Sequence, residues 1–309
     1  MIRHFLSQND LSRDEVIQVL DLAASLRSSP ISDRLRGRSM VMFFEKTSTR
    51  TRLSFEIGMT QLGGHAVHLD RNSSQLSRGE SIRDTALVVS RYADIIMGRV
   101  ESHETLVELS RFASIPVING LSDTEHPMQS MGDLLTIRDA RGKFDNLKIA
   151  YVGDGDNNVT HSLMLACSRV GASIAIAAPE ELAPDPAFAE MASRNAEDSG
   201  GSVIVTTDPL AAARDADVVY TDVWISMGRE AERERRTRLL GPYQVNASLM
   251  AAAKSEAIFM HCLPQHVGDE VTDDVAYGPQ SVIFDQAENR LHVQKAMVLF
   301  LLGGAESHG

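Results

Sequence analysis

The feature that most constrains the fold is a regular alternation of short apolar runs with segments of helical periodicity. Four such runs, at residues 39–44, 65–69, 93–97 and 116–119, are separated by amphipathic stretches. Parallel strands covered on both faces read as short apolar runs, and each return to the same sheet needs a crossover that is usually a helix. The sequence therefore predicts an α/β fold built from parallel sheets flanked by helices.

The alternation continues through a second half of the chain. A segment beginning at Lys148 starts a new series, and further strands are expected at the following segments: 173–177, 202–206, 218–221, 257–260 and 281–284. A chain of 309 residues exceeds what one hydrophobic core usually supports, so two domains are expected. Residues 291–302 have an apolar face at helical spacing and predict a C-terminal helix.

Composition excludes several classes of function. The net charge of −12 argues against nucleic acid or an anionic membrane surface as the main partner. No run approaches the roughly 18 consecutive apolar residues of a membrane span, and residues 1–5 lead into a polar helix without a signal-peptide core. We therefore expect a cytoplasmic protein. Its two cysteines, Cys167 and Cys262, lie far apart, which predicts neither a disulfide framework nor a structural zinc site.

The run Ser48-Thr49-Arg50-Thr51-Arg52 has the composition of an anion site. It places two guanidinium groups and three hydroxyls where a predicted strand hands over to a predicted helix. The free N–H groups and positive dipole end of a helix N-terminus favour an anion, and arginine forks match a phosphoryl group. Alone, the run is equally compatible with a Ser or Thr N-cap followed by surface arginines.

Four separated motifs carry a family resemblance. Residues 45–56 (EKTSTRTRLSFE) resemble the carbamoyl-phosphate signature of the aspartate/ornithine carbamoyltransferase family, and residues 126–129 (HPMQ) resemble its second signature. Residues 222–228 (DVWISMG) and 261–264 (HCLP) are similar to the ornithine branch of that family. The resemblance extends from Phe5 to about residue 302, with the motifs in the family's order.

The resemblance implies a reaction without a metal or organic cofactor. It transfers the carbamoyl group of carbamoyl phosphate to the side-chain amine of L-ornithine, giving L-citrulline and phosphate, a step of arginine metabolism. The implied catalytic residues are Arg99, His126, Asp222 and Cys262. The implied carbamoyl phosphate ligands are Ser48, Thr49, Arg50, Thr51, Gln75, Arg99, His126, Gln129, Cys262, Leu263 and Arg290. The implied ornithine ligands are Asn158, Asp222, Ser226 and Met227.

The resemblance also implies domains and an assembly. Residues 1–134 would bind carbamoyl phosphate, residues 135–290 would bind ornithine, and residues 291–309 would form a C-terminal helix packed on the first domain. The polar loop 70–80 would reach a neighbouring subunit's site and present Gln75 there, in a homotrimer that can stack into larger assemblies.

Alternative interpretations remain at this stage. Within the family, the acceptor could be a modified ornithine or putrescine, and outside it the chain could be a non-catalytic metabolite-binding protein. Gly153-Asp154-Gly155 imitates a dinucleotide fingerprint, but the third glycine is missing and acidic residues stand where a pyrophosphate would approach. Residues 229–238 form the most polar segment, most of which we expect in a solvated helix or loop.

Overall fold

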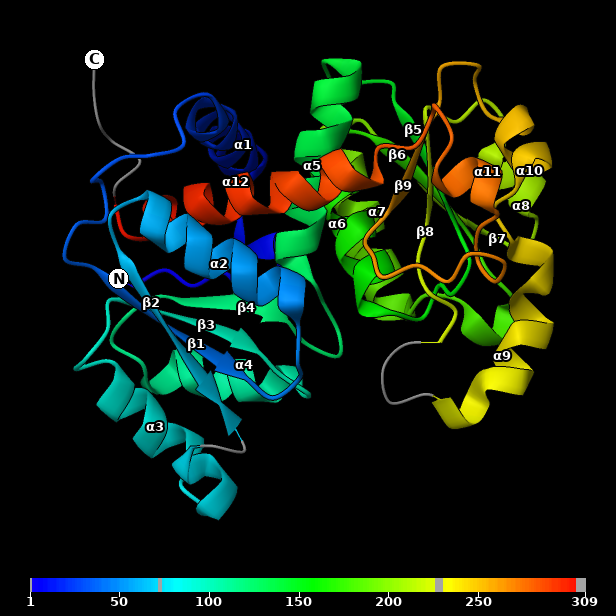
Figure 1. The fold of residues 1–309 in the computed structure, drawn as a ribbon. Helices are drawn as coiled ribbons and strands as arrows, with labels where there is room; N and C mark the ends of the chain where they lie inside the picture. The colour runs from blue at the N-terminus through cyan, green and yellow to red at the C-terminus, as the bar shows by residue number, and fades with distance from the viewer. Residues whose placement is uncertain (1, 72–73, 226–229, 304–309) are drawn as a thin grey trace. The chain divides into compact units, whose positions relative to one another are not determined.

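The computed structural model describes residues 2–71, 74–225 and 230–303. The chain forms two compact units, one containing the residues up to Leu135 together with the segment from Glu288, and the other containing Thr136–Ala287. Each unit is built on one parallel sheet with helices on its faces (Figure 1). This arrangement confirms the predicted α/β class and the return of the C-terminal helix to the first unit.

The first unit contains a four-stranded sheet in the order β2-β1-β3-β4. The strands are β1 (Ser39–Phe44), β2 (His65–Asp70), β3 (Ile95–Arg99) and β4 (Val117–Leu121), and all neighbours pair in parallel. Buried side chains of β1, β3 and β4 pack against α3 (Ile82–Val89) and α4 (His103–Phe112) in one apolar cluster. Figure 1 shows α2 (Thr49–Gln61) and α12 (Ile283–Leu301) over the opposite face. The remaining helices that begin in this unit are η1 (Gln8–Asp10), α1 (Arg13–Ser28), η3 (Gln75–Arg78) and α5 (Pro127–Arg141).

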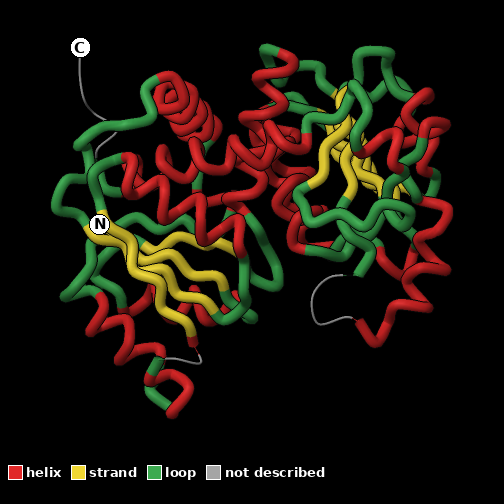
Figure 2. The backbone as a smooth tube through the Cα atoms, in the orientation of Figure 1, coloured by secondary structure: helices red, strands yellow, loops and turns green. Residues whose placement is uncertain are grey.

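The second unit contains a five-stranded sheet in the order β7-β6-β5-β8-β9, again entirely parallel (Figure 2). Its strands are β5 (Lys148–Val152), β6 (Ser173–Ala177), β7 (Val203–Thr206), β8 (Val218–Thr221) and β9 (Ile258–His261). The described helices of this unit are α6 (Asn158–Val170), η4 (Glu180–Leu182), α7 (Pro186–Ser199), α8 (Pro209–Ala213), η5 (Glu230–Glu232), α9 (Arg233–Leu240), η6 (Gly241–Tyr243), α10 (Ala247–Ala252) and α11 (Asp273–Ala276). One face of the sheet packs against α8, α10 and α11, while α6 and α7 lie on the other (Figure 1).

Both sheets contain a point where the strand order reverses. In the first unit the chain places β2 on one side of β1 and β3 on the other, and in the second it places β6 on one side of β5 and β8 on the other. The loops that follow two such neighbouring strands lead away in opposite directions, which opens a crevice at the carboxyl ends of the strands. Ligand-binding residues are therefore expected after β1 and β3, and after β5 and β8.

One sequence prediction needs correction. The strand predicted at 281–284 is wrong, because only Ser281 makes a bridge, to Phe259, and α12 already begins at Ile283. A short apolar run is compatible with either state, and here Asp285 in the first turn favours the helix. In the polar segment, residues 231–238 are exposed as predicted, in η5 and α9, except for Arg236, which is only 1% exposed. No helix in the part of the chain that the structure describes is long and apolar enough to cross a membrane.

Candidate active site

The N-terminus of α2 lies directly after β1, at the reversal point of the first sheet. Ser48 caps the helix in an extended conformation, and its hydroxyl accepts a hydrogen bond from the Thr51 N–H at 3.2 Å. The first turn of α2 contains no acidic residue, so the positive end of the helix dipole is not offset there. Thr49 is exposed and Arg50 is half-buried. This end of the helix is therefore suited to an anion.

Two more arginines come to this region from distant parts of the sequence. Arg99 is the last residue of β3, is 6% exposed, and accepts a backbone hydrogen bond from the Glu45 N–H at 2.8 Å, which joins the ends of β1 and β3. Arg290, on α12, donates from Nη2 to the Thr51 hydroxyl at 2.9 Å. The structure thus brings together residues that the sequence separates by more than two hundred positions.

His126 is buried beside these cations. Burial lowers its pKa well below the usual value, and the positive charges of Arg290, Arg99 and Arg50, in that order, lower it further. The imidazole is therefore neutral at neutral pH, and a neutral imidazole can donate one hydrogen bond without adding a fourth positive charge. All three predicted arginines are therefore close enough to His126 to affect its charge.

Gln129 follows His126 in the first turn of α5 and is 1% exposed. Its side-chain nitrogen donates to Asp133 Oδ1 at 2.9 Å, which fixes the orientation of the amide. Its Oε1 is buried and, among the described residues, has no hydrogen-bond partner. A buried acceptor of this kind suits a ligand that carries an N–H₂ group.

In the second unit, Asp222 follows β8 and Cys262 follows β9. The Cys262 thiol donates to Asp222 Oδ1 at 2.9 Å, and the Val223 N–H donates to the same oxygen at 2.7 Å. Asp222 is 6% exposed, and burial raises its pKa above the ordinary value, although these hydrogen bonds favour the charged form. The resemblance implies that Asp222 would bind the amine of the substrate.

His261, next to Cys262, has both ring nitrogens engaged. Its Nδ1 accepts from the Leu263 N–H at 2.9 Å, so Nε2 carries the proton and faces Glu270 Oε1 at 3.3 Å. Asp222, His261 and Cys262 bring metal-type ligand atoms within 4.8 Å of one another. An ion would have to displace at least one of the hydrogen bonds of His261. Glu270, fully buried, carries no sequence signal that could have identified it.

The remaining ornithine ligands that the resemblance implies are only partly described. Asn158 is the first residue of α6 and is half-buried, directly after the cap residue Asn157, whose Oδ1 accepts from the Thr160 N–H at 2.8 Å. Ser226 and Met227 lie outside the described residues. Two other predicted ligands occupy loops or short turns: Gln75 is exposed on η3, and Leu263 is half-buried with a φ of +59°.

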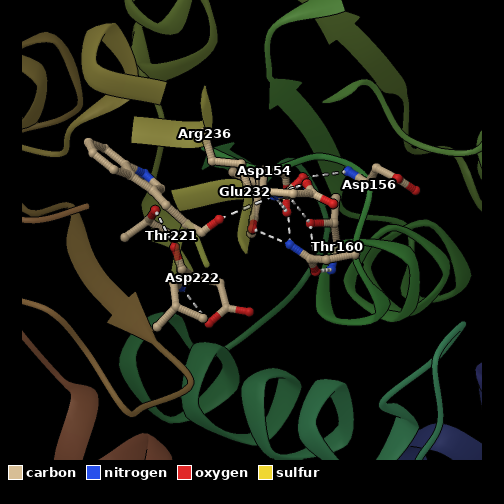
Figure 3. A network of polar contacts seen from close by, with 11 residues as sticks. Asp154, Asp156, Thr160, Thr221, Asp222, Glu232 and Arg236 are labelled. Carbon is tan, nitrogen blue, oxygen red and sulfur yellow. Dashed lines mark hydrogen bonds and ion pairs between the residues drawn. The ribbon is translucent and has the colours of Figure 1, made fainter. Parts of the chain in front are cut away.

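One buried contact of this region was not predicted. Asp154, which the sequence presents only as an acidic residue in an imitation of a dinucleotide loop, is fully buried and binds Arg236 at 2.5 Å (Figure 3). The partners lie 82 residues apart, so no local pattern connects them. A buried carboxylate already paired in this way also explains why the loop does not have the character of a pyrophosphate site.

Comparison with known proteins covers both units. Residues 3–139 match the family model for the carbamoyl-P binding domain of aspartate/ornithine carbamoyltransferases, and residues 145–301 match the model for the Asp/Orn binding domain. The chain belongs to the aspartate/ornithine carbamoyltransferase family.

Relatives of this carbamoyltransferase family match almost the entire chain. Proteins named ornithine carbamoyltransferase are 50% identical over 306 residues in Thermococcus kodakarensis, covering 98% of this chain and 97% of the relative, and 52% identical over 304 residues in Symbiobacterium thermophilum, covering 97% and 98%. The ornithine carbamoyltransferase structure from Pyrococcus furiosus superposes with a TM-score of 0.95 at 48% identity, covering 98% of this chain and 97% of that one. The ornithine transcarbamoylase from Giardia lamblia has a TM-score of 0.90 at 34% identity, covering 98% of each chain.

Proposed function

We propose that the protein transfers the carbamoyl group of carbamoyl phosphate to the side-chain amine of L-ornithine, producing L-citrulline and phosphate. The observation that carries the proposal is the full-length similarity to proteins named for this activity, together with the arginine cluster around a neutral His126. The family models separately name carbamoyl phosphate and Asp/Orn as ligands of the two halves.

In the first unit, the N-terminus of α2 would hold the phosphate group. Ser48, Thr49, Arg50 and Thr51 supply hydroxyl, backbone and guanidinium donors there, and Arg290 is bonded to Thr51. Arg99 and His126 would donate to the carbonyl oxygen, where negative charge develops as the amine attacks. The Oε1 of Gln129 would accept from the carbamoyl N–H₂.

In the second unit, Asp222 would bind the substrate's side-chain amine. An alkyl ammonium with a pKa of about 10.4 is mostly protonated at neutral pH, so it must lose a proton before it can attack. Asp222, bonded to Cys262, would orient the amine and accept that proton. The nitrogen then bonds to the carbonyl carbon, the bond from carbon to the bridging oxygen breaks, and the departing phosphate takes the second proton of the amine. Asn158, with Ser226 and Met227, would bind the amino-acid end.

A citrulline-formation assay tests this proposal and its alternatives. Carbamoyl phosphate would be supplied with L-ornithine, N-acetyl-L-ornithine or putrescine as the acceptor, and the ureido product quantified. We expect fast turnover with L-ornithine and not with the other two acceptors. Preference for either of the other acceptors would change the substrate assignment, and binding of carbamoyl phosphate without turnover of any acceptor would indicate a metabolite-binding protein.

The proposal includes a homotrimer in which subunits complete one another's sites. Gln75 is exposed on η3 in a loop of polar character, which suits a residue that acts on a neighbouring subunit. Mixing a Gln75→Ala chain with an Arg50→Ala chain should restore activity, because some mixed sites would contain neither substitution. An active monomer in light scattering at assay concentration would disprove the trimer.

A cytoplasmic location is also part of the proposal. Neither Cys167 nor Cys262 takes part in a disulfide, as expected for a protein in a reducing compartment. Cell fractionation followed by immunoblotting would test it, and recovery in a secreted fraction would contradict it.

A further inference from the structure

A single guanidinium group connects two segments of the second unit. Arg236, on α9, donates from Nη1 to Asp154 Oδ2 at 2.5 Å and to the backbone carbonyl of Trp224 at 3.2 Å. Its Nε donates to Glu232 Oε2 at 2.9 Å. Arg236 and Asp154 are 1% and 0% exposed, whereas Glu232 is 45% exposed (Figure 3).

The Asp154 end of this contact leads to the start of α6. The carbonyl of Asp154 accepts hydrogen bonds from Asn157 Nδ2 at 2.7 Å and from the Thr160 hydroxyl at 3.0 Å. Because Asn157 is the cap of α6, these bonds fix the first turn of that helix, where Asn158 lies. The position of Asp154 therefore determines the position of Asn158.

The Trp224 end of the contact leads to Asp222. Trp224 is 3% exposed and lies two residues after Asp222, in the loop that follows β8. Its indole lies over Gly153, where an added Cβ would be 3.9 Å from Nε1 and only 3.2 Å from the Thr221 hydroxyl. Burial, and then the carboxylates of Asp222 and Asp154, raise the pKa of Tyr151, so both carboxylates lie near the same buried ring.

A buried ion pair is poor evidence for stability alone. Removing two charges from water costs about as much as their attraction returns, and an apolar pair of similar size is often as stable. A buried ion pair is better suited to fixing one conformation of the chain among several of similar energy. Here it joins the loop after β5 to the loop after β8, which are the two sides of the reversal point of the sheet.

We propose that Arg236 and Asp154 are positioning residues for the amino-acid substrate, holding Asn158 and Asp222 at the separation that ornithine requires. This inference rests on the proposed assignment of ornithine to Asn158 and Asp222. It adds α9, a helix outside the motifs that the sequence analysis identified, to the determinants of acceptor affinity.

The test compares variants of the full-length protein in steady-state kinetics. Arg236→Met removes the charge but keeps most of the side-chain volume, and Asp154→Asn removes the opposite charge. The matched control is Arg233→Met, on the same helix, whose ion pair with Asp269 at 3.6 Å is 56% and 35% exposed. We expect kcat/KM for ornithine to fall by about tenfold to a hundredfold in both pair variants, because small misplacements of binding groups have effects of this size. In the pair variants, the KM for carbamoyl phosphate should stay within about twofold of that of the unmodified protein. All kinetic constants of Arg233→Met should also stay within about twofold, as expected for an exposed ion pair.

A spectroscopic readout follows the loop itself. Trp224 is the only tryptophan of the chain, so its emission and its quenching by acrylamide report on this loop without labelling. Loss of the hydrogen bond to its carbonyl should shift the emission to the red and increase quenching in Arg236→Met, but not in Arg233→Met. Arg236→Lys, which restores a positive charge, should recover part of both effects.

The outcomes separate this inference from the proposed function. An unchanged ornithine KM and unchanged emission in Arg236→Met would overturn the inference. An equal loss of carbamoyl phosphate and ornithine binding would also overturn it, since that is the result of general unfolding. If Arg236→Met does not fold, Asp154→Asn decides by the same criteria. If Asp222→Asn leaves ornithine kinetics unchanged, the ornithine assignment itself is wrong, whatever the Arg236 variants do.

Discussion

The candidate sites of the two units lie at equivalent positions of their sheets, but the charges of the side chains gathered there differ. In both units, candidate site residues lie at or after the ends of strands at the point where the sheet order reverses, Arg99 at the end of β3 in the first and Asp222 after β8 in the second. In the first unit the gathered charges have one sign, with Arg50, Arg99 and Arg290 around a neutral His126. In the second unit the gathered carboxylates are each bonded to a donor, Asp154 to Arg236 and Asp222 to the Cys262 thiol.

The difference indicates how each site is prepared for its ligand. Like charges held close together repel, so the first site gains free energy when a multiply charged anion arrives. The carboxylates of the second site are held by internal hydrogen bonds, so a zwitterionic amino acid meets groups whose positions are already fixed. Fold topology selects the location in both cases, whereas charge composition selects the ligand.

The largest expected effect concerns the cationic site. Arg50→Ala removes a charge-assisted contact that strengthens as negative charge develops, and turnover should fall about a hundredfold or more. The matched control is Arg52→Ala, since Arg52 lies two residues further on but is 49% exposed and paired with Glu56. Steady-state kinetics on both variants measures the contrast. Equal kinetics in the two variants would remove the distinction between anion ligand and surface arginine.

The next effect concerns the acidic site. Asp222→Asn keeps the shape but removes the charge that would bind the amine, and kcat/KM for ornithine should fall about tenfold to a hundredfold. The KM for carbamoyl phosphate serves as the internal control and should not change. A fall in carbamoyl phosphate affinity of the same size would show that the two sites are not separable as the comparison requires.

A smaller effect distinguishes the sites in the absence of turnover. Inorganic phosphate at about 100 times its Kd stabilises a protein by about 2.7 kcal/mol, which corresponds to several degrees in Tm. We expect this shift in differential scanning calorimetry, its loss in Arg50→Ala, and its decrease at high ionic strength. Ornithine alone should give a smaller shift. A larger shift with ornithine than with phosphate would reverse the comparison.

The smallest effect concerns pH. The pKa of His126 is well below its unfolded value of about 6.5, so the unfolded chain binds a proton that the folded chain does not as pH falls below that value. Stability should therefore decrease with falling pH by at most about 1.4 kcal/mol per unit from this group. His126→Gln should flatten that part of the curve in urea titrations between pH 7 and 5, whereas the control His65→Gln, at an exposed position, should not. An unchanged slope in His126→Gln would contradict the buried, neutral state.

The sequence could predict the architecture because apolar period and strand length are local signals. The predicted strands 39–44, 173–177 and 218–221 coincide with β1, β6 and β8. Each run is bounded by turns or helices, and this makes it recognisable as a buried parallel strand. The strand prediction at 281–284 failed because its three apolar residues, 282–284, carry no periodicity that separates a strand from the first turn of a helix. The motif residues Arg50 and His126 were identified by resemblance, and the structure adds that they lie close together.

The contacts that the sequence could not predict are those between distant segments. Arg236 reads as one more cation in a polar helix, and only the tertiary fold buries it on Asp154. The contact of Glu270 with His261, and the tautomer of His261, likewise depend on a loop that returns to β9. Such pairs have no spacing rule, because the separation along the chain is set by the elements between them.

The discontinuity of the first unit has a consequence for the order of synthesis. Two residues of its last helix, α12, bond to the earlier part of the unit. Arg290 donates to the Thr51 hydroxyl, and the buried Lys295 donates from Nζ to Gln61 Oε1 at 2.8 Å. The ribosome reaches this segment about 150 residues after it has finished the preceding part of the unit. At about 5–20 residues per second, the nascent N-terminal half waits roughly 8 to 30 seconds for its last helix. The second unit, continuous in sequence, can complete its own fold during that interval, so the half of the protein that is translated first is expected to mature last.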